Sequence, residues 1–407
     1  MRNKRKIIND PLYGFITLPF DIIYDIIEHP YFQRLRRIRQ LGLTSMVYPG
    51  AYNKRFHHAI GAMYLAMQAV DVLRQKGHEL TKEECQGLAI AILLHDIGHG
   101  PFSHALEHTL VKNITHEEFS ILLMERLNQE FDGQLTLAIQ IFQNKYPKLF
   151  LHQLISSQLD VDRLDYLNRD SFYTGVQEGV VGVERIIKLL NVKDGNLVVD
   201  QKGIYSIEKF LVARRIMYWQ VYLHKTVISA EFLLINILRK AKELALEGEE
   251  LFCSPALREF LYHDHNAKSF EESPDLLLVF SELDDYDILS AIKVWKSHQN
   301  YALAKLCTWM VNRNLYKVEM SKTPIEESRI QELTDKVKNE YRFDSKDLPL
   351  VVFDNKVENT AYDPSKGIQI LYKNGQLADI GEASDHLNIN SLSTPVQKYF
   401  VCYPKST

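Results

Sequence analysis

Apolar residues recur along most of the chain at the three- and four-residue spacing of amphipathic helices. This spacing predicts helices that begin near Asp21 and Pro30 and helices over residues 55–76, 82–94, 151–169 and 207–246. Thr115 and Glu118 have the spacing of a capping box and predict one more helix start. No apolar run approaches the roughly 18 residues that a membrane span requires. We therefore expect a mainly helical protein without a membrane segment.

The pattern changes after about residue 312. The last part of the chain predicts strands over 316–320, 350–353 and 369–373, a helix over 325–341 and an edge strand over 397–403. Asn374-Gly375 is typical of a hairpin turn, and Asp194-Gly195 predicts a similar hairpin earlier in the chain. Residues 6–20 look like an irregular arm. We expect two domains, a helical one over 1–311 and a small α+β one over 312–407.

Composition narrows the class of protein. With 407 residues, 46% of them apolar, the chain can bury a large core. A net charge of -4 and a pI near 6.4 argue against an electrostatic nucleic-acid binder. The four cysteines lie far apart, which favours a reducing cytoplasm over a disulfide framework or a zinc finger. The basic N-terminus is not followed by the apolar region of a signal peptide. These features predict a cytoplasmic protein.

The stretch 91–100 carries the strongest chemical signal. An apolar segment ends in His95-Asp96, which offer an imidazole nitrogen and a carboxylate oxygen, both suited to a divalent transition metal. Neighbouring side chains on a helix point about 100° apart, so the two can share one ion only where the helix ends. Gly98 and Gly100 follow and predict that end.

A second His-Asp pair provides an internal comparison. His263-Asp264 lies in the polar run 262–266, with no apolar helix before it and no pair of glycines after it. We interpret this second pair as a solvated loop. The dipeptide alone therefore means little, and a site at His95-Asp96 needs partners from elsewhere in the chain.

Other segments carry residues that could complete such a site. His58 follows Arg55 at the start of a predicted helix. His116 follows a predicted N-cap, and this position taken singly favours a cap or surface role. Asp162, Tyr166 and Asp170 recur every four residues and share one helical stripe. The stripe is either functional or a solvent-facing ridge. The arginines at 34, 36, 37 and 39 likewise fit either anion binding or a solvated basic face.

Taken together, these segments resemble the HD superfamily of metal-dependent phosphohydrolases, and most closely its deoxynucleoside triphosphate triphosphohydrolase branch. The resemblance covers about residues 6–240, and the region after it matches less clearly. The matching segments are 9–11, 32–36, 40–42, 49–51, 55–58, 95–104, 115–117, 160–166 and 222–225. The resemblance implies a helical HD core with a small C-terminal α+β appendage.

The resemblance also implies roles for individual residues. One divalent transition metal (Mn, Fe, Ni, Co or Zn) would be held by His58, His95, Asp96 and Asp162, with Mg as a further candidate on the substrate phosphates. The implied catalytic residues are His99, His116 and Asp96. The two histidines would lie beside the scissile phosphate, where a proton must reach the leaving oxygen. The implied substrate contacts are Gln40, Leu41, Arg55, Arg163, Tyr166, Asp170, Arg214, Tyr222 and Lys225. A candidate effector site between subunits comprises Lys6, Asn9, Glu28, Gln33 and Arg36.

The activity implied by the resemblance is hydrolysis of a dNTP to deoxynucleoside and triphosphate, in a homo-dimer or homo-tetramer that a nucleotide activates. His57 departs from the animal sequence pattern next to the metal histidine, and Arg163 stands where that pattern has a lysine. Leu223 departs from the pattern near the base, so the base preference stays open. Two alternatives remain. One is an HD phosphodiesterase or phosphatase that acts on another nucleotide, and the other is a nucleotide-sensing regulatory protein with little turnover.

Overall fold

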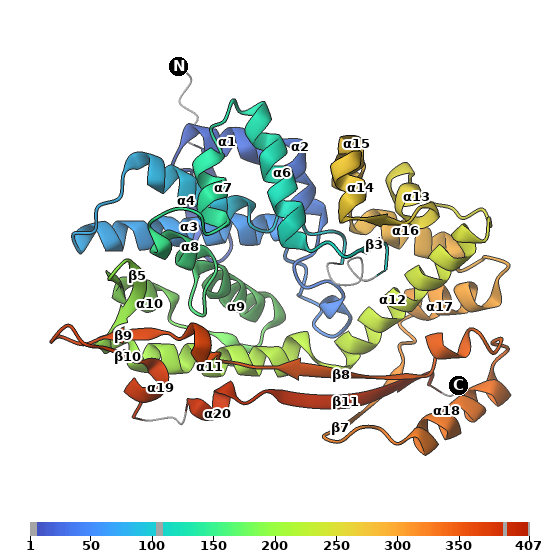
Figure 1. Cartoon of the computed structure of the whole chain (residues 1–407). Coiled ribbons are helices and arrows are strands. Elements are labelled where there is room, and N and C mark those ends of the chain that lie inside the picture. Colours follow the sequence, from blue (N-terminus) through green and yellow to red (C-terminus); the bar gives the residue numbers. More distant parts are fainter. Residues whose placement is uncertain (1–5, 103–108, 386–388, 406–407) are drawn as a thin grey trace.

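In the computed structural model, which describes residues 6–102, 109–385 and 389–405, the helices α3 (Arg55–Gln75) and α4 (Lys82–Leu94) pack against each other (Figure 1). α4 begins with a capping box: the Thr81 hydroxyl accepts from the amide of Glu84, whose carboxylate accepts from the amide of Thr81. Residues 88–94 of α4 are fully buried. A helix covered on all sides needs no polar face, and this explains its uninterrupted apolar sequence.

Further helices pack on this pair or lie beyond it, and they make the fold mainly helical, as expected. They are α1 (Asp21–Glu28), α2 (Pro30–Gln33), α6 (His116–Glu130), α7 (Thr136–Phe142), α8 (Leu149–Ile155), α9 (Val161–Thr174), α10 (Val183–Leu189), α11 (Ile204–Met217), α12 (Lys225–Leu246), α13 (Pro255–Tyr262), α14 (Ala267–Glu272), α15 (Pro274–Glu282), α16 (Asp285–Trp295) and α17 (Tyr301–Val311). The predicted capping box at Thr115 and Glu118 is confirmed at the start of α6.

Three predicted helices are interrupted. The helix expected from Pro30 ends at Gln33, gives way to a 3₁₀ turn, η1 (Arg34–Arg37), and leaves Ile38 extended. The helix expected over 151–169 is divided into α8 and α9, because Asp160 caps a new helix by accepting from the amide of Arg163 at 2.7 Å. The helix expected over 207–246 breaks at a π-helical turn, η5 (Tyr218–Tyr222), before α12 begins.

The break between α11 and α12 bends the chain by 55°. Apolar periodicity continues through it, so the pattern alone could not reveal the break. π-helical turns occur often at functional sites, and this one carries Tyr222. Among the described residues no single helix is long and apolar enough to cross a membrane, although this bent pair meets the length and composition criteria together.

Within the described residues, the strands form four small sheets. Residues expected to form an irregular arm instead form an antiparallel hairpin of β1 (Ile7–Asp10) and β2 (Gly14–Thr17), because Gly14, with a φ of 72°, can complete the turn. The predicted hairpin around Asp194-Gly195 is confirmed as β4 (Leu190–Lys193) and β5 (Asn196–Asp200). The short strands β3 (Val111–Lys112) and β6 (His265–Asn266) pair in parallel.

The C-terminal region forms a three-stranded sheet beneath α12 (Figure 1). Its order is β7 (Lys317–Ser321), β11 (Val396–Tyr403) and β8 (Phe353–Asn359), so the strand expected at the edge, β11, is the central one. The strand expected over 350–353 begins only at Phe353, because a 3₁₀ turn, η6 (Leu348–Leu350), precedes it. Phe232 of α12 packs against the rings of Phe353 and Phe400.

A second connection joins the C-terminal region to the helical part. The predicted hairpin at Asn374-Gly375 is confirmed as β9 (Gln369–Leu371) and β10 (Leu377–Asp379), and β9 pairs in parallel with β5. Both regions therefore share one four-stranded sheet, and the division at residue 312 stays a prediction. The remaining helices of this region are α18 (Glu327–Glu340), α19 (Ile380–Ala383) and α20 (Asn390–Ser393).

Candidate metal centre and active site

Three elements bring together the donor atoms of a metal site. His58 lies in the first turn of α3, His95 directly follows α4, and Asp162 lies in the first turn of α9. The Nε2 atom of His58 is 3.1 Å from Oδ1 of Asp162 and 3.3 Å from Nε2 of His95, which is 3.6 Å from the same Oδ1. Tetrahedral coordination with bonds of about 2.1 Å separates donors by about 3.4 Å. The donor set therefore fits one divalent transition metal.

The fourth predicted ligand, Asp96, lies at the rim of this cluster. Its Oδ1 is 3.5 Å from Nε2 of His95, its Oδ2 is 3.8 Å from Nε2 of His58, and its carboxylate forms a buried ion pair with Arg55. His95 and Asp96 face the same site because α4 ends at Leu94. Coordination by Asp96 stays a prediction, and its contact with Arg55 is an observed one.

Gly98 serves this arrangement through its small size. A Cβ at this position would collide with backbone atoms of His116 and Ser120 in α6. The Ser120 hydroxyl donates to the carbonyl of His95 at 2.8 Å and accepts from the amide of Gly98 at 3.0 Å. The glycine expected to end a helix thus also allows α6 to approach the metal-ligand loop.

Hydrogen bonds to the far side of each imidazole orient the two histidines. Nδ1 of His58 lies 2.8 Å from a carboxylate oxygen of Asp165, and Nδ1 of His95 lies 2.7 Å from the carbonyl of Ile92. An acceptor at Nδ1 fixes the proton there and leaves the Nε2 lone pair available to a metal. Both imidazoles are therefore arranged as metal ligands need to be.

A buried chain of charges holds Asp165 in place. Arg169 donates two hydrogen bonds of 2.9 Å to Asp165 and one of 2.8 Å to Asp10, the last residue of β1. All three side chains are almost fully buried, and Gly61 in α3 leaves the room that Arg169 and Asp165 occupy. Sequence reasoning assigned no role to Asp165 or Arg169, because their four-residue spacing resembles an ordinary surface ion pair.

The carboxylates give the centre a strong preference for positive charge. Burial opposes protonation of His58, but hydrogen bonds to Asp162 and Asp165 outweigh it and raise the pKa of His58 to about 10. Burial would raise the pKa of Asp162, yet hydrogen bonds to His58 and His95 hold it well below its usual range. His58, His95 and Asp162 would hold a divalent cation here, and its charge would replace that of the protonated imidazole.

The two predicted proton-transfer histidines lie next to each other. The rings of His99 and His116 stack with centroids 3.8 Å apart, and Nε2 of His99 is 3.3 Å from Oδ1 of Asp96. Burial and the charge of Arg55 lower the pKa of His99 to about 3, so His99 is neutral at pH 7. The proton-transfer roles of His99 and His116 both stay predictions. His104, which belongs to the matched segment 95–104, lies outside the described residues.

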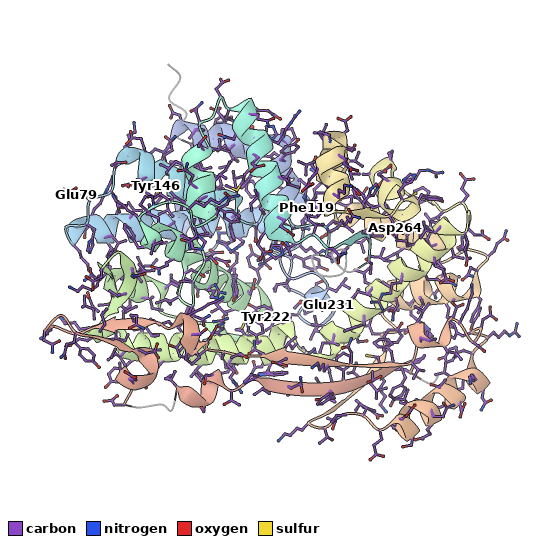
Figure 2. All side chains as sticks on the ribbon, in the orientation of Figure 1. Glu79, Phe119, Tyr146, Tyr222, Glu231 and Asp264 are labelled. Atoms are coloured by element: carbon purple, nitrogen blue, oxygen red, sulfur yellow. The ribbon has the colours of Figure 1, made fainter. Side chains whose placement is uncertain are left out.

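The other end of the α9 stripe is buried and hydrogen-bonded. Asp170 is 2% exposed, and its two carboxylate oxygens accept from Nδ2 of Asn53 at 2.8 Å and from the hydroxyl of Tyr222 at 2.9 Å. Burial raises the pKa of Asp170 to about 6 against the effect of these two hydrogen bonds. Figure 2 shows Tyr222 near the junction of α11 and α12, and its ring meets that of Tyr166 edge-on at 6.2 Å. The stripe is therefore no solvent-facing ridge.

The remaining predicted contacts lie at varied distances from this centre. Arg163 forms an ion pair with Asp160, and Nη1 of the buried Arg214 is 3.4 Å from Oε1 of Gln158. The backbone amide of Gln40 donates to the carbonyl of Asn53. Leu41 is buried, and Lys225 is exposed at the start of α12. Their substrate contacts stay predictions.

The candidate effector residues lie near the N-terminal hairpin and α1–α2. Nζ of Lys6 donates to the hydroxyl of Tyr24, the side chain of Gln33 donates to the carbonyl of Ile27, and Arg36 donates to Gln33 and covers the ring of Phe56. Asn9 and Glu28 are exposed. Effector binding there stays a prediction.

Arg34 is a positioning residue that sequence reasoning missed. Of the two alternatives offered for the arginine run, the solvated basic face is wrong for Arg34, because its side chain is fully buried. Nη1 of Arg34 donates to the carbonyl of His99 at 2.7 Å, and Nη2 donates to the carbonyl of Ile97 at 3.4 Å. Burial lowers the pKa of Arg34 to about 9. Arg34 thus holds the backbone of the loop that carries the HD motif.

A helical core that gathers two histidines and nearby aspartates from α3, α4 and α9 around a metal-sized space defines an HD-type phosphohydrolase. The HD domain family matches residues 55–170, and the HD associated region matches residues 181–266. The chain is 32% identical over 394 residues to the uncharacterized protein YwfO of Bacillus subtilis, which covers 94% of this chain and 88% of that protein. The chain belongs to the HD-domain phosphohydrolase family.

Two further similar proteins have names that state an activity. A solved phosphohydrolase from Bacteroides thetaiotaomicron superimposes with a TM-score of 0.96 at 54% identity, covering 98% of this chain and 100% of that one. The deoxynucleoside triphosphate triphosphohydrolase SAMHD1 of Homo sapiens is 30% identical over 278 residues, which is 56% of this chain and 44% of that protein. The chain thus matches less than half the length of the human protein.

Proposed function

We propose that this protein hydrolyses a deoxynucleoside triphosphate to deoxynucleoside and inorganic triphosphate. The observation that carries the proposal is Asp170, buried beside Asn53 and Tyr222 on the same helical stripe as Asp162. Eight residues along α9 correspond to about 12 Å. One helix can thus offer a phosphate-binding metal centre and, beyond it, a carboxylate that accepts from a sugar hydroxyl. Relatives named as dNTP triphosphohydrolases support this substrate class.

A divalent transition metal at His58, His95 and Asp162, with Asp96 as the further ligand, would act as a Lewis acid and activate water. Arg55, beside Asp96, is placed to stabilise negative charge on the phosphoryl oxygens. His116, stacked on His99, is proposed to donate a proton to the leaving 5′-oxygen.

Substrate contacts farther from the metal complete the proposal. Tyr166 and Tyr222 would pack against the nucleoside, Gln40 and Leu41 would line the sugar and base, and Asp170 would accept from the 3′-hydroxyl. Arg163, Arg214 and Lys225 would bind the phosphate tail, with Mg²⁺ as a further candidate there. The preferred base and the metal among Mn, Fe, Ni, Co and Zn are left to experiment.

A product-resolved assay tests the activity. Purified protein is incubated with each dNTP and each of these metals in turn, and anion-exchange chromatography separates triphosphate from pyrophosphate and phosphate. We expect equal amounts of deoxynucleoside and triphosphate. Formation of monophosphates alone, or of no product with any metal, would refute the proposal.

The variant Asp170→Asn distinguishes nucleotide recognition from general phosphoesterase chemistry. Asparagine keeps the size of the side chain but has only one acceptor oxygen for Asn53, Tyr222 and a sugar hydroxyl. We expect kcat/KM for the best dNTP to fall at least tenfold while metal content and hydrolysis of bis(p-nitrophenyl) phosphate stay within twofold of the wild type. Equal losses on both substrates would favour the phosphodiesterase alternative.

We also propose a cytoplasmic homo-dimer or homo-tetramer with a nucleotide activator at the effector residues. The β1–β2 hairpin exposes Ile7 and Phe15 at 62% and 77%, which suits a subunit contact. Free thiols at all four cysteines suit a reducing compartment. Light scattering after gel filtration, with and without dNTP and GTP, tests assembly. A monomer under all conditions would contradict it.

A further inference from the structure

A second group of metal-binding side chains lies outside the HD centre, at the end of α13. Oε1 of Glu259 is 3.2 Å from Nδ1 of His263 and 3.0 Å from Nε2 of His265. The three donor atoms all lie within 4.8 Å of one another. The two distances from Glu259 are close to the roughly 3.4 Å expected between ligands of a tetrahedral ion with bonds of about 2.1 Å.

The local backbone brings these donors to one side. Glu259 and His263 are four residues apart, so the last turn of α13 places them on one face. His263 is extended, with φ of -129° and ψ of 148°, and His265 follows two positions later in β6. Side chains two apart in an extended chain point the same way. Helical and extended periodicities thus converge on one set of donors.

The exposure of the three side chains suits an ion that keeps a solvent position. His265 is 14% exposed and packs edge-on against Phe260 at 5.5 Å, whereas Glu259 and His263 are 35% and 59% exposed. A mostly buried first ligand gives the site a fixed position, and the exposed side leaves room for water as the fourth ligand.

Neighbouring contacts connect this cluster to the segment that leads to His116. The backbone of His265 pairs with Val111 in the β3–β6 ladder. Lys242 of α12 donates to the carbonyl of Leu110 at 3.1 Å, to that of His263 at 3.3 Å, and forms an ion pair of 3.0 Å with Asp264. Figure 2 shows Asp264 on the side of the molecule where α12 and β3 lie, well away from Tyr222.

We propose that Glu259, His263 and His265 form a second divalent-metal site, separate from the HD centre, that takes Zn²⁺ or a similar transition ion. Two imidazole nitrogens and one carboxylate oxygen are the donor types that such ions select. An ion there joins the end of α13 to β6 and thereby stabilises the pairing of β6 with β3. Asp264, whose carboxylate is directed to Lys242, is not a ligand.

Metal stoichiometry of the full chain tests this site without any nucleotide, so its outcome is independent of the proposed activity. Chelator-treated protein is dialysed against buffered Zn²⁺, and bound zinc is measured by mass spectrometry. We expect two equivalents for the wild type, one for His263→Ala, one for Asp162→Ala, and close to none for the double variant. Asp264→Asn is the matched control in the same turn and is expected to keep two.

The variant Glu259→Gln provides a second measurement in case His263→Ala does not fold, because it changes only one ligand oxygen to an amide. It is expected to lose the same equivalent. Hydrogen exchange then locates the ion: Zn²⁺ should slow exchange at residues 110–112 and 263–267 at least threefold in Asp162→Ala, and should have no such effect in Asp162→Ala with His263→Ala.

Two results would overturn the proposal. One is a wild type that binds a single equivalent which Asp162→Ala abolishes. The other is a second equivalent that His263→Ala and Glu259→Gln both retain, because the ion would then lie elsewhere. In either case the close contacts of Glu259 would be ordinary hydrogen-bonded ion pairs.

Discussion

The chain contains the dipeptide His-Asp twice, and its two surroundings differ in almost every physical respect. His95-Asp96 lies at the buried end of an apolar helix and meets donors from α3 and α9, more than 30 residues away in either direction. His263-Asp264 lies at the exposed end of α13, and its neighbours Glu259 and His265 come from the same seven-residue stretch. The first site depends on the tertiary fold and the second on the local backbone.

This difference sets how each site is stabilised. The buried donors are oriented before any ion arrives, by the Asp165–Arg169–Asp10 chain and by the carbonyl of Ile92. The donors at α13 have water on one side and only His265 is firmly packed. Removal of one residue should therefore weaken the preorganised site strongly. Removal of one residue from the exposed site should cost little beyond that residue's own contribution.

The largest expected effect is the loss of turnover in Asp96→Asn. The change removes the negative charge that Arg55 and His99 contact and that the metal centre is predicted to use. We expect kcat/KM to fall by about 10³-fold or more, because catalytic groups that act as a unit fail together. Steady-state kinetics with metal analysis measures the loss. Asp264→Asn is the matched control, and similar losses in both variants would remove the distinction between the two sites.

The next effect tests the buried charges behind the metal ligands. Arg169→Met leaves Asp165 and Asp10 buried without their partner, which is expected to lower the free energy of unfolding by about 3–5 kcal/mol. Loss of the group that orients His58 should also weaken metal binding by about 10–100-fold. Urea unfolding and metal titration measure the two effects.

An exposed ion pair provides the control for Arg169→Met. Lys188 and Glu184 pair on α10 with side chains 66% and 84% exposed. Lys188→Met should change stability by less than about 0.5 kcal/mol. If both variants lowered the free energy of unfolding equally, the buried Asp165–Arg169–Asp10 network would stabilise the fold no more than an exposed ion pair does.

The candidate metal donors could be predicted because they belong to separate, strongly periodic segments, which the family resemblance then joined into one site. His58, His95 and Asp162 each begin or end a helix, and the four-residue stripe of α9 places Asp162 and Asp170 on one side. Arg34 and Arg169 could not be found that way. A buried guanidinium and a solvated one look alike in sequence, and only the tertiary partners distinguish them.

The errors in the fold have similar causes. The break at Tyr218–Tyr222 keeps the apolar spacing of a helix, so nothing in the pattern reveals the bend that brings Tyr222 to Asp170. β11 was expected at an edge, yet it lies between β7 and β8, because strand order depends on partners about 40 and 80 residues away. Local periodicity identifies helices and strands but does not show which other elements they pair or pack with.

A smaller effect concerns pH and the sugar-facing end of the site. Burial raises the pKa of Asp170 to about 6 in the folded protein, above the roughly 3.9 of an unfolded chain. Because its pKa is higher in the folded protein, Asp170 contributes its full share to the free energy of unfolding below pH 4. This contribution disappears as the pH rises through 6. Its full size is at most about 3 kcal/mol at 1.36 kcal/mol per pH unit.

The variant Asp170→Asn checks this sign. Because asparagine does not titrate, the difference in unfolding free energy between variant and wild type should shift in favour of the variant from pH 4 to pH 7. Urea titrations at half-unit steps measure the shift. A difference that does not vary over this range would show that Asp170 ionises in the folded protein as it does in water.

The smallest effect is expected at the second His-Asp pair itself. Asp264 is 55% exposed, and its ion pair with Lys242 at 3.0 Å is screened by water, so Asp264→Asn should lower the free energy of unfolding by less than about 1 kcal/mol. Lys242 keeps its bonds to the carbonyls of Leu110 and His263, and the β3–β6 pairing should therefore persist. Urea unfolding together with amide exchange at residues 110–112 measures both. A loss above about 2 kcal/mol would mean that this pair supports the fold in the way the buried one does, and that exposure and local sequence origin are poor guides to how much a His-Asp pair matters.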